Sequence, residues 1–176
     1  MTTSGSSSDS VSEGRRLEQA KVYGSWYHKA VNSRSFADAV VVSFGARAAR
    51  AEVDARGDDA TAILEPGNAD ACSLRVAYQP RHEVVTLFLG VEEVPLELSL
   101  TGPVGLDDVR PWLGARLEAA FEGRYEQERT TLRDGSLVSV VGTFHLQDGD
   151  VRHVYRRRLG WFRRKLRRRV TFAPYE

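Results

Sequence analysis

Residues 124–146 read RYEQERTTL, then RDGS, then LVSVVGTFHL, and this stretch decides the predicted fold. The runs 124–132 and 137–146 alternate polar with apolar side chains, which is typical of strands that bury one face. Asp134 and Gly135 lie between them and supply the backbone freedom of a tight hairpin turn. We therefore predict an antiparallel hairpin. A second turn at 147–150 extends it into a third strand over 151–157.

The segment in front of the hairpin has the period of an amphipathic helix. Its apolar stripe consists of Leu106, Val109, Leu113, Leu117, Ala120 and Phe121. Asp107 and Asp108 lie at its start, where the helix dipole favours acidic side chains, and Gly123 supplies a stop. A helix over 107–122 is therefore predicted.

Further toward the N-terminus, residues 37–101 change to a period of two. The predicted strands run over 37–44, 47–54, 60–65, 73–79, 83–90 and 94–100. Glycine- and proline-containing turns separate them, and short strands at regular spacing favour an antiparallel sheet.

The first thirty-one residues fall into two parts. Residues 1–9 are rich in serine, threonine and glycine and are predicted to be disordered. Residues 11–31 have helical spacing with a wide aromatic face, which would pack on a sheet or, through Trp26 and Tyr27, anchor a partner or a membrane interface. The expected fold class is thus α+β: one domain over 10–176, with two helices packed on a mainly antiparallel sheet that could close partly into a barrel.

Charge is divided unevenly along the chain. Residues 152–176 hold ten arginine or lysine residues and one acid, whereas residues 1–151 carry a net charge of −8. Such a separation of sign indicates a surface that steers binding to an anionic partner.

The basic segment over 152–169 fits both strand and helix, because its apolar residues are spaced by three or four while 151–157 alternate. We predict a strand to residue 157, a basic turn or short helix over 160–168, and a terminal strand over 169–173. The candidate binding residues are Arg156, Arg157, Arg158, Trp161, Phe162, Arg163, Arg164, Lys165, Arg167, Arg168 and Arg169.

Three interpretations of this segment stay open. The arginines could form a solvated surface that meets the domain's own acids, as charge runs usually do. They could bind an anionic membrane with Trp161, Phe162 and Leu166 at the headgroups. They could also bind nucleic acid, with Tyr155 or Trp161 stacking on bases, or an acidic protein.

Residue patterns typical of catalysis or of a cofactor are absent from the sequence. The four histidines are dispersed; His145 and His153 could be neighbours across the last hairpin, but two exposed strand histidines are the expectation. Cys72 has nearby Asp70, which would raise its pKa, so a nucleophilic role is not expected. A binding or scaffolding role without a cofactor follows, with a small enzyme or ligand carrier that uses the sheet face as the alternative class.

The expected location is a reducing cytoplasm, with peripheral attachment to a membrane as an extension. The chain begins without an apolar signal segment, contains a single cysteine, and nowhere has eighteen consecutive apolar residues.

Residues 95–144 resemble part of the GIDE-type domain, which occurs beside the RING of membrane-embedded ubiquitin ligases and in bacterial proteins. The matching positions are Glu126, Leu132, Gly135, Val138, Val140 and Gly142. The chain lacks the RING cysteines and the transmembrane helices of those ligases. The resemblance implies a β-rich accessory fold and carries no catalytic residues.

Overall fold

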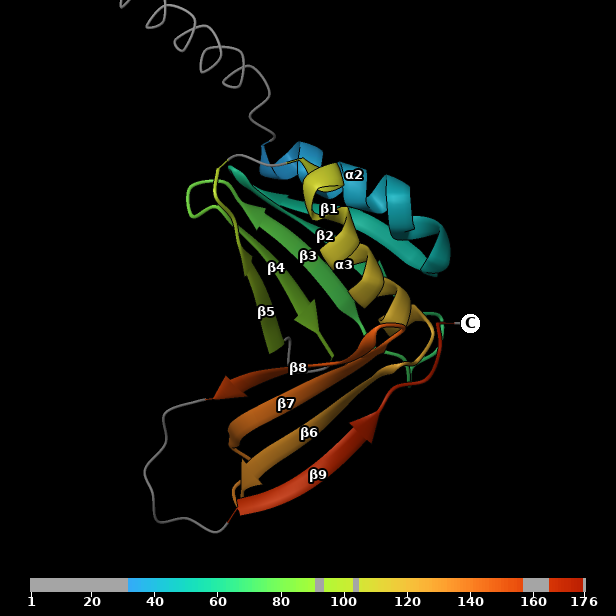
Figure 1. The fold of residues 1–176 in the computed structure, drawn as a ribbon, viewed down its shortest axis with the longest axis vertical. Coiled ribbons are helices and arrows are strands. Elements are labelled where there is room, and N and C mark those ends of the chain that lie inside the picture. The colour runs from blue at the N-terminus through green and yellow to red at the C-terminus, as the bar shows by residue number, and fades with distance from the viewer. Residues whose placement is uncertain (1–31, 91–93, 103–104, 157–164, 176) are drawn as a thin grey trace, which may run out of the picture. The chain divides into compact units, whose positions relative to one another are not determined.

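The computed structural model describes residues 32–90, 94–102, 105–156 and 165–175. These residues form two α-helices and nine strands, and the strands make two antiparallel sheets (Figure 1). The α+β class is therefore confirmed. The predicted partial barrel is not found in this part of the chain, because no edge strand of one sheet pairs with an edge strand of the other. The predicted helix over 11–31 and residues 1–9 lie outside the described residues.

The first sheet is a meander in which each strand pairs with its neighbour in sequence. Its strands are β1 (Arg50–Arg56), β2 (Asp59–Glu65), β3 (Leu74–Gln79), β4 (Val84–Leu89) and β5 (Val94–Ser99). Ala62, Val76 and Leu87 lie in register on one face and are fully buried. Because side chains alternate along a strand, this face carries the apolar residues that the period-two pattern predicted.

Helix α2 (Ser33–Phe44) replaces the strand predicted over 37–44. The Asn32 side chain caps its start and accepts a hydrogen bond of 2.7 Å from the Ser35 amide. Phe36, Val40 and Phe44, which are spaced by four, are buried together on the sheet, whereas Val42 is 85% exposed. The three consecutive valines favoured a strand by propensity, but the helical spacing of the flanking aromatic residues decides the structure.

Helix α3 (Leu106–Phe121) confirms the predicted helix, and its apolar stripe is buried. The Asp108 carboxylate accepts a 2.7 Å hydrogen bond from the Gly105 amide at the start. Gly123 has a positive φ of 69°, and a Cβ there would lie 2.9 Å from the Pro174 nitrogen. The chain can therefore leave the helix only through a glycine at this position. Both helices lie on the same side of the five-stranded sheet (Figure 1).

The second sheet has the strand order β8-β7-β6-β9. Its strands are β6 (Tyr125–Leu132), β7 (Leu137–Leu146), β8 (Gly149–Arg156) and β9 (Lys165–Thr171). The predicted hairpin and third strand are confirmed, with Gly135 and Gly149 at positive φ in the two turns. Strand β9 pairs with β6 along its whole length, so the turn or short helix predicted through 165–168 is wrong there. Leu166 and Val170, four apart, share one face of a strand as readily as one face of a helix.

Residues 173–175, which follow β9, contact helix α3 and the part of the chain that carries the five-stranded sheet. The Ala173 amide donates to Asp70 O at 3.0 Å, and the Tyr175 amide donates to Phe121 O at 2.9 Å. The buried Tyr175 hydroxyl lies 2.9 Å from Leu64 O and 2.7 Å from the Cys72 carbonyl oxygen. These contacts hold the end of β9, whose Thr171 pairs with Glu126 at the beginning of β6, against α3 and the five-stranded sheet.

Candidate binding surface

The four-stranded sheet presents two different faces. Its buried face carries Tyr125, Gln127, Phe144 and His153, which are at most 9% exposed. Its opposite face, called here the outer face, carries Glu126, His145, Asp150 and Arg169 in neighbouring strands. At the end of the sheet nearest α3 the register therefore separates a mainly aromatic layer from a charged one.

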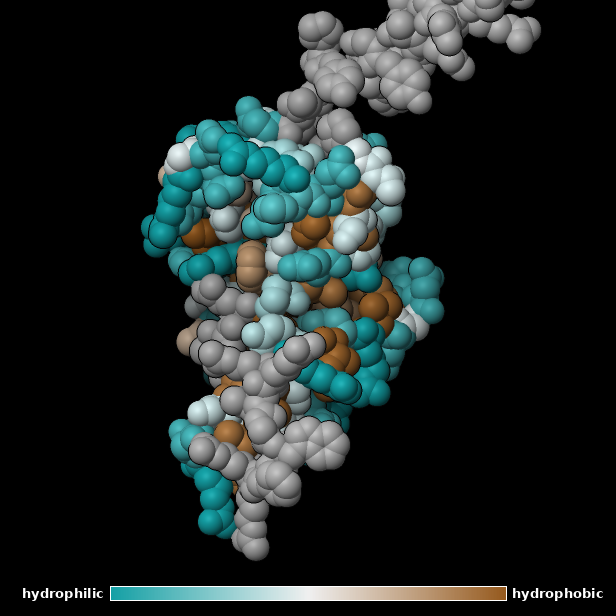
Figure 2. Space-filling model, turned by 90° about the vertical axis from the view of Figure 1, so that its left-hand side faces the viewer, coloured by the Kyte–Doolittle hydropathy of each residue, from teal (hydrophilic) through white to brown (hydrophobic). Residues whose placement is uncertain are grey.

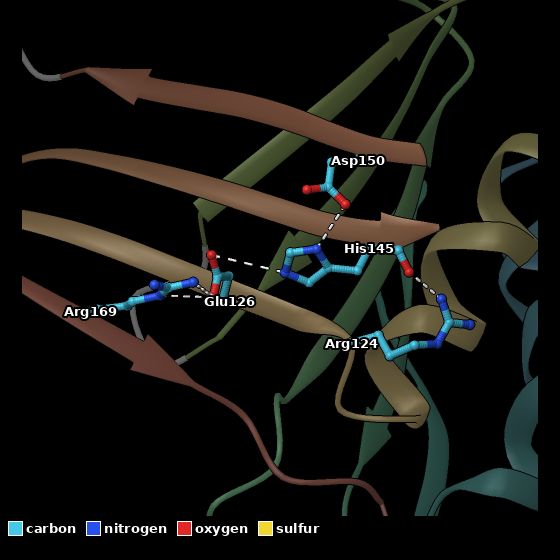
Figure 3. A network of polar contacts seen from close by, with 5 residues as sticks. All are labelled: Arg124, Glu126, His145, Asp150 and Arg169. Carbon is cyan, nitrogen blue, oxygen red and sulfur yellow. Dashed lines mark hydrogen bonds and ion pairs between the residues drawn. The ribbon is translucent and has the colours of Figure 1, made fainter. Parts of the chain in front are cut away.

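A polar network spans the outer face at the end nearest α3 (Figure 3). His145 Nδ1 lies 2.8 Å from Asp150 Oδ1, and its Nε2 lies 3.9 Å from Glu126 Oε1. The Arg169 guanidinium donates to Glu126 Oε2 from Nε at 2.8 Å and from Nη2 at 2.5 Å. The Arg124 guanidinium donates to the His145 carbonyl oxygen. The network thus engages two acids of this face with a histidine and an arginine of the same face.

The opposite, distal end of the sheet is formed by the ends of β6 and β8 and the beginning of β9. The register places Arg156 beside Ser139, Ser139 beside Thr130, and Thr130 beside Arg167. The turn between β6 and β7 brings Arg133 to this end, and Arg168 follows Arg167 in β9. We call these four exposed arginines, Arg133, Arg156, Arg167 and Arg168, the basic end.

Few acids balance the basic end. Arg167 is 78% exposed and lies 3.9 Å from Glu128, which makes a weak, solvated pair. Among the described residues, no carboxylate lies within ion-pair distance of Arg133, Arg156 or Arg168. Glu126 and Asp150 are held by Arg169 and His145 at the other end of the outer face. Glu128 and the turn residue Asp134 are the acids toward the distal end, against four arginines.

Two aliphatic side chains are exposed among these arginines. Val154 is 52% exposed on the outer face of β8, and Leu166 is 56% exposed in β9 on the other face. Figure 2 views the molecule from the side at which β8 ends and β9 begins, and apolar areas lie among hydrophilic residues on the surface visible there. The end of the sheet therefore combines exposed cationic and exposed apolar side chains.

The charge asymmetry of the sequence persists in the fold. The described residues from 124 onward comprise nine basic and five acidic residues, a net charge of +4. Those from 32 to 123 comprise eight basic and thirteen acidic residues, a net charge of −5. The four-stranded sheet is thus the basic part of the described chain.

The structure brings only part of the predicted binding segment together. Arg156 ends β8, Lys165 begins β9, and Arg167, Arg168 and Arg169 follow in β9. The segment from 165 onward is therefore part of the sheet, and Arg169 is engaged by Glu126. The remaining candidates, Arg157, Arg158, Trp161, Phe162, Arg163 and Arg164, lie outside the described residues.

Sequence reasoning missed Arg133 and Val154 as members of this surface. Arg133 belongs to the predicted hairpin turn, and only the strand register shows that this turn lies at the same end of the sheet as Arg156 and Arg167. Val154 could have been found from the alternation of 151–157, which places it on the same face as Arg152 and Arg156.

The expected exposure of both hairpin histidines is wrong for His153. His153 is buried opposite Gly142, whereas His145 lies on the outer face. Two histidines on opposite faces cannot share an ion. Among the described residues, no cluster of histidine, cysteine and acidic side chains fits a metal ion.

Cys72 is fully buried, and this burial raises the pKa of its thiol to about 12. The thiol is therefore protonated near neutral pH. The sequence also predicted a raised pKa for Cys72, but from a different cause, the nearby Asp70. A buried and protonated thiol is typical of a structural cysteine.

None of the described helices is both long and apolar enough to cross a bilayer. Compared with protein family models, curated proteins and solved structures, the chain matches none, and the resemblance to the GIDE-type domain stays a prediction.

Proposed function

We propose that this chain is a binding module that docks reversibly on an anionic phospholipid surface through the basic end of its four-stranded sheet. The observation that carries the proposal is the position of Val154 and Leu166, two exposed aliphatic residues among four exposed arginines. Peripheral membrane contacts combine these two kinds of side chain, because cations meet the phosphates while apolar groups reach the acyl boundary.

The expected affinity is low. A basic residue near an anionic leaflet contributes about 1 kcal/mol, so four arginines supply about 4 kcal/mol. That free energy corresponds to a dissociation constant of about 1 mM, which the two aliphatic contacts would improve only moderately. The attachment would be reversible and sensitive to salt.

The exposed side chains favour a membrane over a nucleic acid. Proteins that bind single strands stack bases on exposed aromatic rings. Tyr155, which the sequence offered for stacking, is half-buried and points to the face opposite Arg156. Among the described residues, the large exposed apolar side chains are aliphatic, namely Val42, Val154 and Leu166.

Co-sedimentation with vesicles tests the proposal. We expect the full chain to sediment with phosphatidylcholine vesicles that contain phosphatidylserine, and not with phosphatidylcholine alone. The double variant Arg156→Ser with Arg168→Ser should bind about 30-fold more weakly, which is the loss of about 2 kcal/mol. Raising the salt concentration should release the protein.

The matched control is Arg34→Ser with Arg56→Ser, two exposed arginines of the acidic part of the chain. This control should keep the affinity of the parent protein. Equal binding to neutral vesicles, or equal losses in the two double variants, would contradict the proposal. A gel shift with RNA or DNA that depends on Arg156 and Arg168, without vesicle binding, would assign the basic end to nucleic acid instead.

A further inference from the structure

Strand β9 lies at one edge of the four-stranded sheet. In the strand order β8-β7-β6-β9 it pairs with β6 along Lys165–Thr171, and no described strand pairs with its other side. An edge strand presents a row of backbone N–H and C=O groups, which can serve as a template for an added strand. The side of β9 that faces away from β6 over residues 165–171 is called here the open edge.

The register identifies the residues whose backbone groups face the open edge. The His145 amide donates to Arg124 O at 2.9 Å, so the backbone of residue 124 faces β7. Because this direction alternates along a strand, the odd-numbered residues of β6 face β9. Residues 127 and 129 pair with 170 and 168, so the even-numbered residues of β9 face β6. The open edge therefore consists of the backbone groups of the odd-numbered residues, which include Arg167, Arg169 and Thr171.

The chain itself pairs with the continuation of this edge just beyond β9. Ala173, two residues after Thr171, forms a parallel bridge with Ala71, and its amide donates to Asp70 O at 3.0 Å. Within the described ranges, this pairing is not continued alongside residues 165–171. An extended segment thus already lies against one end of the open edge.

The exposed side chains of β9 restrict what can be added there. Arg167 and Arg169 lie exposed on the outer face, and Arg168 lies exposed on the opposite face. Leu166, on the same face as Arg168, is also exposed. The side chains of an added strand lie directly opposite these residues, where opposite charges stabilise the pairing and like charges destabilise it. A second copy of β9 is therefore disfavoured, because antiparallel pairing about Arg168 places Arg167 opposite Arg169.

We propose that the open edge of β9 binds an extended acidic segment of another protein as an additional strand of the sheet. The partner's main chain hydrogen-bonds to residues 167, 169 and 171, as in other complexes formed by strand addition. Its acidic side chains lie opposite the three arginines, and an aliphatic side chain covers Leu166. This binding needs no bilayer and goes beyond membrane docking, with which it shares Arg167 and Arg168.

Fluorescence anisotropy with the full chain, in the absence of vesicles, tests the proposal. The probe is a labelled, end-capped peptide of sequence Thr-Val-Glu-Glu-Glu-Val-Thr, which can place an acid opposite each arginine, and we expect it to bind saturably. The same peptide N-methylated at its glutamate amides keeps its charge and loses hydrogen-bond donors. It should bind about tenfold more weakly. Equal binding of the two peptides would reveal attraction by charge alone and would overturn the proposal.

Two substitutions at one position test the open edge from the side of the protein. Arg167→Thr removes an arginine, whereas Arg167→Pro also removes the N–H group that faces the open edge. An edge strand tolerates proline where the N–H group does not bond to its neighbour. The peptide should bind Arg167→Pro about threefold more weakly than Arg167→Thr. Equal affinities would contradict strand addition. Sedimentation of the free protein as a dimer that the peptide dissociates would assign the open edge to a second copy and overturn the proposal.

Discussion

Gly142 is the residue of β7 on which the packing of the His153 ring depends. A Cβ at this position would overlap the imidazole and lie 2.6 Å from Tyr125 Oη. Gly142→Ala should therefore lower the free energy of unfolding by about 1–3 kcal/mol, as overpacking a core does.

The control for this substitution is Gly114→Ala in α3, where the nearest side-chain atom would be 3.8 Å away. An alanine in a helix interior should stabilise the protein by about 0.5–1 kcal/mol. Urea unfolding of both variants measures the difference. If the Gly142→Ala protein were as stable as the parent, the His153 ring would not pack against Gly142.

The His153 ring also makes stability depend on pH. Its burial, and secondarily the Arg116 charge, lower the pKa of His153 to about 4 from an ordinary value near 6.5. Between these pH values the unfolded chain binds a proton that the folded chain does not. Stability should therefore fall as the pH drops from about 6.5 to about 4, by at most about 3 kcal/mol.

His153→Phe removes this titration and keeps an aromatic ring beside Tyr125 and Phe144. Urea unfolding at pH 7 and at pH 5 compares the two proteins. The parent should lose more stability than the variant on acidification. Equal losses would show that His153 titrates normally in the folded state.

At the scale of elements, one substitution in α2 distinguishes a helix from a strand, because it changes stability in opposite directions in the two structures. Val42 is 85% exposed, and valine is a poorer helix former than alanine by about 0.5 kcal/mol. Val42→Ala should therefore stabilise the protein by about that amount, whereas in a strand the same change would destabilise it. Val40→Ala, at a fully buried position, should cost about 1.5–3 kcal/mol in the same thermal or urea unfolding.

The elements show what the sequence could and could not predict. The hairpin turns at Gly135 and Gly149 and helix α3 followed from local signals, because glycine conformation and helical periodicity are encoded within a few residues. Strand propensity failed over 37–44, where tertiary packing of Phe36, Val40 and Phe44 overrides three valines. The turn or short helix predicted through 165–168 was wrong, because the apolar spacing there fits both a helix and a strand. Only the pairing with β6 decides between them.

The candidate surface was predictable in charge but not in geometry. The excess of arginine is visible in the sequence, yet Arg133 joins Arg156 and Arg167 only through the strand register. A row of hydrogen bonds joins Arg129, Gln127 and Tyr125 within β6 and continues from Tyr125 to His153 in β8. The step from β6 to β8 had no sequence signal, because it depends on the strand register.

At the scale of the whole molecule, the described chain divides into an acidic part with the five-stranded sheet and a basic part with the four-stranded one. Such a division orients a protein toward an anionic surface, because one part is attracted and the other repelled. A single end of the molecule should therefore meet the bilayer.

The burial of Cys72 determines whether a cysteine introduced at the surface can be labelled selectively. It is fully buried with a raised pKa, so in the folded protein it should not react with thiol reagents at neutral pH. Quantifying the reaction of the parent protein with a chromogenic disulfide before and after unfolding in urea checks this. Rapid reaction of the folded protein would contradict the described burial.

The decisive measurement places an environment-sensitive fluorophore on one introduced cysteine at a time, in Val154→Cys, Leu166→Cys and Val42→Cys. All three positions are exposed, but only Val154 and Leu166 lie near the basic end. On addition of phosphatidylserine-containing vesicles, the emission should shift to the blue at 154 and 166 and stay unchanged at 42. A shift at 42 equal to the other two, or no shift at 154 and 166 while the protein sediments with the vesicles, would contradict docking through the basic end.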